Sequence, residues 1–233
     1  MSSNTPEYLH IDIWSDYVCP WCWIAERRLE TALERFQHRD LVEIGYRSYR
    51  LAPDSGPEPF VAALVRKFGD SKPAMSMMQG VQAHAATLGL TYHLDTMLLG
   101  DTIKAHTLVK SITDEALRKR LVERLYEATT SEGRSIFERQ SLAEIAAEVG
   151  VPPAVADRAW SDDALTQLVI VDEKQAHAVG AGVPLFVFND DFYISGAQPI
   201  EAYTQALEKM YSSSIDGFSS IQGQTCSMTG CDS

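Results

Sequence analysis

The sequence has little cysteine and no long hydrophobic run. Only four of its 233 residues are cysteine, and no stretch approaches the roughly 20 apolar residues of a membrane-spanning helix. The segment from Met1 to His10 has no basic region followed by an apolar one, so no secretory signal is visible. We therefore predict a cytoplasmic protein with no membrane partner. Paired cysteines in that compartment are more often catalytic, redox-sensing or metal-binding than structural.

Clustered positive charge is also missing. The chain has 20 Lys and Arg residues against 32 Asp and Glu residues, a net charge of −12, and its basic residues form no run. Nucleic acids and anionic membranes are bound through concentrated positive charge, so neither is an expected partner. The sequence also shows no internal repeat and no glycine-rich phosphate loop. We interpret the acidity as a feature that maintains solubility.

One cysteine pair, Cys19 and Cys22, stands where a strand-like segment gives way to a helix-like one. Apolar residues alternate at positions 9, 11 and 13, the period of a strand with one buried and one exposed face, and then recur with a helical period to about residue 38. The first turn of a helix presents unpaired N–H groups and the positive end of its dipole, which stabilise a thiolate. Cys19 is therefore the candidate nucleophile. Cys22, about one helical turn further on, is the candidate resolving thiol.

The residues around this pair favour redox chemistry over the other uses of a CxxC motif, which are zinc sites and structural thiols. Pro20 suits the first helical position because it lacks an N–H and its φ is already near helical. Trp21 adds apolar surface without charge. Asp16 is interpreted as a turn or capping residue rather than one that opposes the thiolate. Charged residues of the expected helix, Glu26, Arg27, Glu30 and Glu34, fall largely off its apolar face.

A second strand is expected over residues 42–46, which completes a βαβ unit. Prolines and a glycine then break the chain, and the segment from Phe60 to about Gly182 has helical periodicity throughout. Asp114, Ser141 and either Ser161 or Asp162 are candidate N-caps within it.

Two further strands are expected near the C-terminus. Residues 184–188 form one and residues 192–194 the other, joined by a turn at 189–191, which predicts a hairpin. A closing helix follows from Ile200. After Tyr211 the composition shifts to Ser, Gly and Gln, which indicates a flexible tail.

Taken together, this order of elements resembles a thioredoxin fold of the DsbA type, and in particular the FrnE-like branch of that family. The resemblance is carried by Trp14-Ser15-Asp16, Cys19-Pro20-Trp21-Cys22, Ala105-His106-Thr107-Leu108, Gly182-Val183-Pro184 and Ile194-Ser195-Gly196-Ala197-Gln198. It implies an α/β thioredoxin fold with a large all-helical insertion between the second and third strands. The implied units are a discontinuous thioredoxin-like domain (1–52 and 163–211), a helical insertion domain (53–162) and a flexible C-terminal tail (212–233) that carries the second cysteine pair.

The resemblance also implies a cis peptide bond before Pro184, which places that loop against Cys19 so that the Val183 backbone pairs with a bound substrate chain. Val183 and Pro184 then join Pro20 and Trp21 as expected substrate-binding residues. One departure concerns the middle motif, where relatives usually have an arginine after the histidine. No ligand contact is therefore assigned to His106, which is interpreted as a packing or capping residue.

We predict a thiol-disulfide oxidoreductase or isomerase that exchanges disulfides with proteins or small molecules. Cys226 and Cys231, with four residues between them, are hypothesised to exchange with the first pair and relay redox equivalents, as in FrnE-like relatives that carry an extra C-terminal pair. The alternative is two incidental thiols. This interpretation needs no metal or cofactor, although glutathione is a candidate co-substrate, and it makes no prediction of the oligomeric state.

Two other functions stay open. Kappa-class glutathione transferases and chromene-carboxylate isomerases have similar folds and act with glutathione, but they commonly have serine where Cys19 stands. The four cysteines would also supply a tetrahedral zinc set if the tail folded over the first pair.

Overall fold

A four-stranded sheet organises residues 8–215, which are the residues that the computed structural model describes. The strands lie in the order β2-β1-β5-β6; β1 is parallel to β2 and antiparallel to β5, and β5 is antiparallel to β6. Their bounds are β1 (Leu9–Ser15), β2 (Val42–Ser48), β5 (Leu185–Phe188) and β6 (Phe192–Ser195). Cys226 and Cys231 lie outside the described residues.

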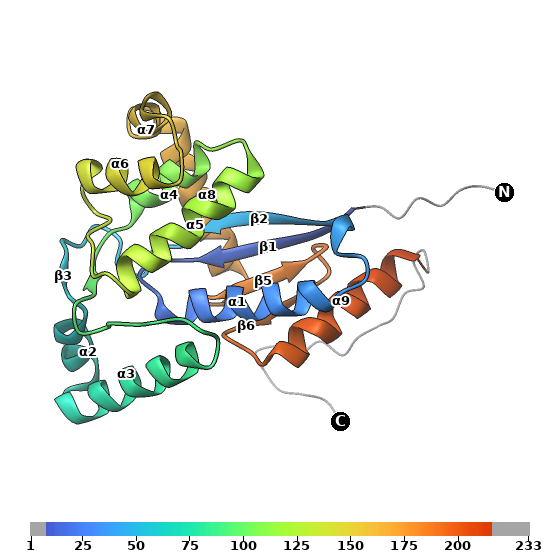
Figure 1. The fold of residues 1–233 in the computed structure, drawn as a ribbon, viewed down its shortest axis with the longest axis horizontal. Coiled ribbons are helices and arrows are strands. Elements are labelled where there is room, and N and C mark those ends of the chain that lie inside the picture. Colours follow the sequence, from blue (N-terminus) through green and yellow to red (C-terminus); the bar gives the residue numbers. More distant parts are fainter. Residues whose placement is uncertain (1–7, 216–233) are drawn as a thin grey trace.

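Two helices lie side by side on one face of this sheet, α1 (Pro20–Arg35) and α9 (Ile200–Ile215) (Figure 1). The apolar residues of β1 that alternate in the sequence pack against them, because successive strand side chains point to opposite faces. The units β1-α1-β2 and β5-β6-α9 form the predicted thioredoxin fold. The closing helix runs to Ile215, past the tail boundary that we had expected after Tyr211.

The opposite face of β1 is covered as well, by α8 (Asp163–Ala178). The Trp14 indole N–H donates to the Asp172 carbonyl at 2.8 Å, and the Ser48 N–H donates to the Asp172 carboxylate at 2.8 Å. Lys110 forms an ion pair with the same buried carboxylate. The first strand is therefore buried on both faces, whereas its alternation predicted one exposed face.

Between β2 and β5 the chain forms a helical insertion at one end of the sheet (Figure 1). A single 3-10 turn, η1 (Arg39–Leu41), comes before β2. The insertion contains α2 (Phe60–Phe68), α3 (Ser71–Ala86), α4 (Ile103–Lys110), α5 (Glu115–Thr130), α6 (Arg139–Glu148) and α7 (Pro153–Ala159), together with a ribbon of β3 (Glu58–Pro59) and β4 (Leu98–Leu99). The insertion between the second and third strands of the main sheet is confirmed, and the ribbon is an addition that the sequence did not indicate. The domain boundaries at 53 and 162 stay a prediction.

Asp114 and Asp162 cap α5 and α8 as predicted. Their carboxylates accept hydrogen bonds from backbone N–H groups of the first turn at 2.6 and 2.9 Å. Ser141 is not an N-cap, because α6 already begins at Arg139 and the Ser141 hydroxyl donates to the Ser135 carbonyl at 2.6 Å. The prediction failed because a serine in the first turn can bond backward to the preceding loop.

The predicted hairpin is present, with its turn at residues 189–191. Asn189 and Asp190 have φ values of 49° and 55°, in the left-handed region that Asn and Asp tolerate better than most side chains. The peptide bond between Val183 and Pro184, directly before β5, is cis. The cis bond that the resemblance implied is therefore confirmed.

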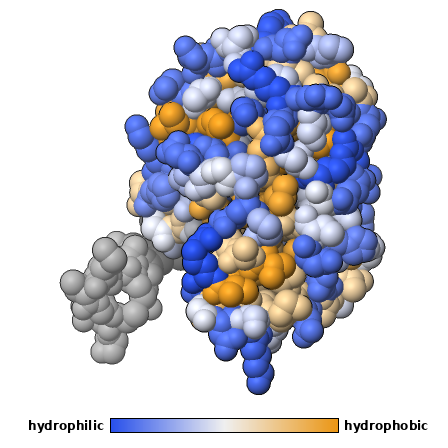
Figure 2. Space-filling view, turned by 90° about the vertical axis from the view of Figure 1, so that its left-hand side faces the viewer, coloured by the Kyte–Doolittle hydropathy of each residue, from blue (hydrophilic) through white to orange (hydrophobic). Residues whose placement is uncertain are grey.

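Figure 2 views the molecule from the insertion end. Hydrophilic side chains cover most of this face, and hydrophobic groups gather in its lower half, at the level of α2 and α3 in Figure 1. Phe68 and Met75 are exposed hydrophobic side chains of those two helices. Among residues 8–215, no helix has the length and apolar character needed to cross a membrane.

Candidate active site

Cys19 is the N-cap residue of α1 and follows the loop that leaves β1. Its backbone is extended, with φ −95° and ψ 108°, and Pro20 occupies the first helical position as predicted. The Cys19 N–H donates to the Asp16 carbonyl at 3.0 Å, which closes the turn. The thiol therefore lies at the end of the helix where unpaired N–H groups and the helix dipole favour a thiolate.

Cys22 lies one turn further into α1 and is fully buried, whereas Cys19 keeps 5% of its surface exposed. Both are free thiols. Burial, followed by a hydrogen bond with Cys19 and the nearby Cys19 charge, raises the pKa of Cys22 well above its usual value. When reduced, Cys22 thus remains a protonated thiol at neutral pH.

The loop before β5 reaches the first thiol. The Val183 carbonyl oxygen lies 4.0 Å from the Cys19 Sγ. Among the expected substrate-binding residues, Pro20 and Pro184 are buried, whereas Trp21 and Val183 keep part of their surface exposed. Beside Cys19, the Trp21 and Val183 residues are thus the accessible members of this set, and the two prolines are buried.

The aromatic residues beside the motif divide into one surface group and one core group. Trp21 lies at the surface, with its ring 5.4 Å from the His84 ring on α3. Trp23 is buried and stacks between Tyr92 at 5.7 Å and Tyr126 at 6.1 Å, with interplanar angles of 15° and 8°. Trp23 therefore joins α1 to the insertion through core packing, and Trp21 alone of the two has surface available for a substrate.

Asp16 holds the motif loop in place rather than capping α1. Its carboxylate is fully buried and accepts hydrogen bonds from the Leu51 N–H at 2.7 Å and the Thr102 hydroxyl at 2.8 Å. The Val18 N–H, 3.5 Å from the same carboxylate, adds a local contact within the turn, as the turn interpretation predicted. Thr102 directly precedes α4, so the carboxylate connects the thiol loop to the insertion. The Leu51 and Thr102 partners were not detectable from the sequence, because both are far from Asp16 along the chain.

We expect Asp16→Ala to lower the free energy of unfolding by about 3 kcal/mol, because the buried Thr102 hydroxyl and the half-buried Leu51 N–H lose their acceptor at once. Thr102→Val removes only one of these hydrogen bonds and should cost about 1 kcal/mol. Urea unfolding of the two variants beside the wild type measures both effects. Equal costs for the two substitutions would show that Asp16 does not bridge the loop and the insertion.

His106 is a packing residue, as predicted. Its side chain is buried, its ring lies 4.7 Å from the Tyr17 ring, and its Nε2 lies 3.1 Å from the Tyr49 carbonyl oxygen. It stabilises the underside of the motif loop and lies away from any surface that a substrate could reach.

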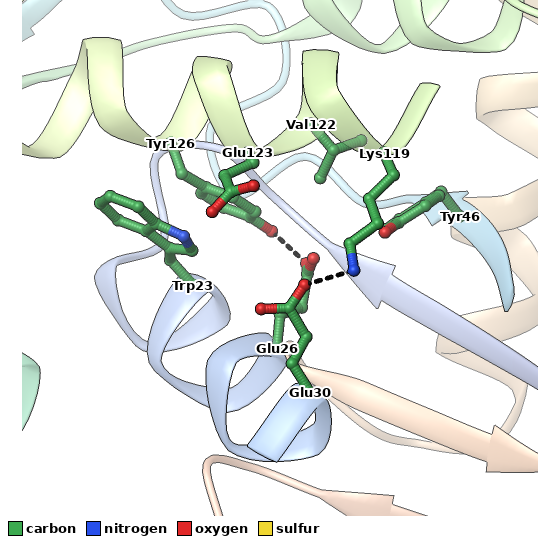
Figure 3. A pocket seen from close by; sticks show the side chains of 8 residues that line it. All are labelled: Trp23, Glu26, Glu30, Tyr46, Lys119, Val122, Glu123 and Tyr126. Carbon is green, nitrogen blue, oxygen red and sulfur yellow. Dashed lines mark hydrogen bonds and ion pairs between the residues drawn. The ribbon is translucent and has the colours of Figure 1, made fainter. Parts of the chain in front are cut away.

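Glu26 is a residue near the thiols to which the sequence analysis gave no role. It lies off the apolar face of α1 that packs on the sheet, yet it is only 9% exposed and accepts a hydrogen bond from the Tyr126 hydroxyl at 2.6 Å (Figure 3). Burial raises the pKa of Glu26 to about 8, against the opposing effect of the Tyr126 hydrogen bond. The signal that was available is the four-residue spacing from Cys22, which puts both side chains on one face of α1.

No cluster of three or more His, Cys, Asp and Glu side chains suited to a metal ion is present between residues 8 and 215. The four-cysteine zinc set includes Cys226 and Cys231, which lie beyond that range. It therefore stays an untested hypothesis.

Comparison with known proteins places this geometry in context. The family model described as a DSBA-like thioredoxin domain matches residues 10–208. The structure is similar to a probable DsbA oxidoreductase from Streptomyces coelicolor, with 31% identity, a TM-score of 0.83, and coverage of 97% of this chain and 99% of that one.

More distant structures share the fold. The cytosolic disulfide reductase DsbM from Pseudomonas aeruginosa has 19% identity, a TM-score of 0.62, and coverage of 86% of this chain and 97% of that one; a second DsbM structure contains GSH. A 2-hydroxychromene-2-carboxylate isomerase has 17% identity, a TM-score of 0.64, and coverage of 90% of this chain and 100% of that one.

Proposed function

This chain belongs to the DSBA-like thioredoxin family and is a thiol-disulfide oxidoreductase, and from that premise we propose that Cys19 and Cys22 are its redox-active pair. Cys19 attacks the disulfide of a protein or small-molecule substrate, and Cys22 resolves the mixed disulfide. The supporting observation is the contrast between the two thiols: Cys19 caps α1 beside the Val183 carbonyl, whereas Cys22 is fully buried behind it.

The proposed reaction has two exchange steps. The Cys19 thiolate attacks one sulfur of the substrate disulfide, forms a mixed disulfide and releases the other sulfur as a thiolate. Cys22 then loses its proton and attacks the Cys19 Sγ, which forms the Cys19–Cys22 disulfide and releases the second substrate thiol. The substrate gains two electrons and the protein loses them. The reverse sequence oxidises a substrate dithiol.

The Val183 carbonyl and the Trp21 side chain position the substrate in this scheme. An extended peptide lying along the loop before β5 would donate a backbone N–H to the Val183 carbonyl, as in the addition of a strand to a sheet edge. Glutathione is itself a short peptide with a thiol, and a DsbM structure contains GSH. We therefore propose it as a small-molecule partner.

A glutathione titration tests the redox pair. The protein is equilibrated at a series of ratios of reduced to oxidised glutathione, free thiols are alkylated, and peptides are quantified by mass spectrometry. We expect Cys19 and Cys22 to change oxidation state together, with a single midpoint. A Cys19 that remains alkylatable at every ratio would contradict the proposed function and would direct attention to metal content instead.

We further propose that Cys226 and Cys231 relay redox equivalents to Cys19, the feature that also suggests the FrnE-like branch. The same titration should then yield a crosslinked peptide between Cys19 and the tail at intermediate ratios. The double variant Cys226→Ser/Cys231→Ser should lack this crosslinked peptide. It should also turn over more slowly with any oxidant that reacts first with the tail pair. Unchanged turnover and midpoint in the double variant would remove the relay and leave the first pair unaffected.

A further inference from the structure

The loop that joins β6 to α9, residues 196–198, continues the sheet toward the cis-proline bond. Pairing of β5 with β6 ends at Ser195, and the Gly196 N–H then donates to the Pro184 carbonyl at 2.8 Å. Gly196 has a φ of 75°, in the left-handed region that favours glycine, so the chain turns out of the strand at this residue. The position of this loop therefore determines that of Pro184 and, through it, that of the Val183 carbonyl, which lies beside the nucleophilic thiol.

One side chain, Arg28 on α1, holds this loop in place. Its Nη1 donates to the Ala197 carbonyl at 2.9 Å and to the Gln198 carbonyl at 3.0 Å. The other hydrogen bonds of Gln198 stay within residues 195–198. In the part of the chain from residue 8 to residue 215, the loop is thus hydrogen-bonded to other segments only through Gly196 and Arg28.

The Arg28 guanidinium is available to these carbonyls because it has no carboxylate partner. Its neighbour Arg27 pairs with Glu30 and Glu123, whereas Arg28 is half-buried and forms no ion pair among residues 8–215. The Arg28 Nη2 lies 3.4 Å from the His84 Nδ1 on α3. Because α1 packs against both α3 and α9 (Figure 1), this one side chain connects the insertion, the active-site helix and the loop.

We propose that Arg28 is a positioning residue that holds the Val183 carbonyl beside Cys19, and that it thereby sets a preference of the protein for peptide disulfides over small disulfides. Arg28 itself does not touch the substrate in this scheme. The inference rests on the proposed function, because it needs the Val183 carbonyl to pair with the backbone of a bound peptide.

The geometry supports this role because α1 carries both ends of the connection. Cys19 is the N-cap residue of α1, and Arg28 lies nine positions further on, about 13 Å along the helix at 1.5 Å per residue. A helix is a stiff support, so the loop bonded to Arg28 is held at a fixed distance from the Cys19 sulfur. A peptide disulfide has to meet this sulfur and the Val183 carbonyl at once, whereas a small disulfide without a backbone needs only the sulfur.

The test compares two disulfides that release the same coloured thiolate, TNB, when Cys19 attacks them. One is the small symmetrical disulfide DTNB, and the other is a short unstructured peptide whose single cysteine carries TNB. The full-length protein carries Cys22→Ser, Cys226→Ser and Cys231→Ser, so that Cys19 is its only thiol. For Arg28→Met we expect the rate constant for the peptide to fall roughly tenfold, the usual effect of one lost hydrogen bond, and that for DTNB to stay unchanged.

Two further variants calibrate this result. Arg28→Lys keeps the charge but lacks the planar fork of a guanidinium, so it should slow the peptide less than Arg28→Met does. It also serves for the whole comparison if the methionine variant does not fold. Arg35→Met removes an exposed arginine from the last turn of the same helix and should behave like the unsubstituted protein. An equal loss of rate with both disulfides in Arg28→Met would overturn the inference, because it would show an effect on the thiol itself.

A methylated peptide supplies a readout that a merely structural role would not move. Methylation of a backbone nitrogen removes the N–H that pairs with the Val183 carbonyl, and each residue next to the cysteine is methylated in turn. With Arg28 present, methylation at one position should slow the peptide roughly tenfold, whereas in Arg28→Met the same methyl group should have almost no further effect. Additive losses would overturn the inference, since they would mean that Arg28 and the Val183 carbonyl act independently.

Failure of the proposed function gives a different result. If Cys19 releases no TNB from DTNB, the assignment of Cys19 as the nucleophile is contradicted, whatever residue stands at position 28. If DTNB reacts but methylation has no effect at any position with Arg28 present, the inference fails and the redox chemistry of Cys19 stands.

Discussion

Replacing Cys19 with serine is expected to abolish disulfide exchange, and replacing Cys22 with serine is expected to stop it halfway. Without Cys19 the remaining thiol of the pair is fully buried and has a raised pKa, so it is neither accessible nor ionised. Turnover should fall by several orders of magnitude, to the rate of the uncatalysed exchange between the substrate disulfide and small thiols in solution. Without Cys22 the first attack still occurs, but nothing resolves the product.

The measurement is intact-mass analysis after brief exposure to oxidised glutathione. Cys22→Ser, in which Cys19 remains, should gain the mass of one glutathione, and Cys19→Ser, in which Cys22 remains, should gain none. To confine the comparison to this pair, both substitutions are made in the Cys226→Ser/Cys231→Ser background. Rapid glutathionylation of Cys22 in the absence of Cys19 would reverse the assignment of the two roles.

The fold was predictable because its central elements leave local signals. The alternation in β1 and the helical period after Pro20 are patterns within about 30 residues, and the turn at Asn189 and Asp190 uses residues that tolerate a positive φ. The cis bond before Pro184 came from the resemblance, since a sequence does not by itself distinguish the two isomers. The exposed face that alternation assigned to β1 is absent because α8 covers it.

The polar parts of the candidate site were not predictable, because their partners are distant along the chain. Glu26 falls on the polar side of a helix that would be exposed if β1, α1 and β2 stood alone. The insertion brings α5 across that side, and Tyr126, 100 positions further on, supplies the hydrogen bond that makes burial tolerable. Asp16 is similar, since its acceptor role depends on Thr102 at the start of α4. Helical periodicity describes one helix and its nearest core, and it carries no information about a second layer that covers it.

The buried carboxyl of Glu26 should also give the protein a distinctive dependence of stability on pH. In the unfolded chain this group loses its proton near its ordinary pKa of 4.5, whereas in the folded protein burial raises the pKa to about 8. Between these values the folded state holds one proton more than the unfolded state, so the free energy of unfolding falls as pH rises from about 4.5 to about 8. The contribution is fully present below that window and lost above it.

Glu26→Gln removes this term. We expect the variant and the wild type to be about equally stable near pH 4.5, and the variant to be more stable by up to about 5 kcal/mol above pH 8, since one pKa unit corresponds to roughly 1.4 kcal/mol. Urea unfolding of both reduced proteins across this range gives the difference, and Glu34→Gln controls for the loss of a surface charge. A variant destabilised by the same amount at every pH would mean that Glu26 is ionised and paired throughout.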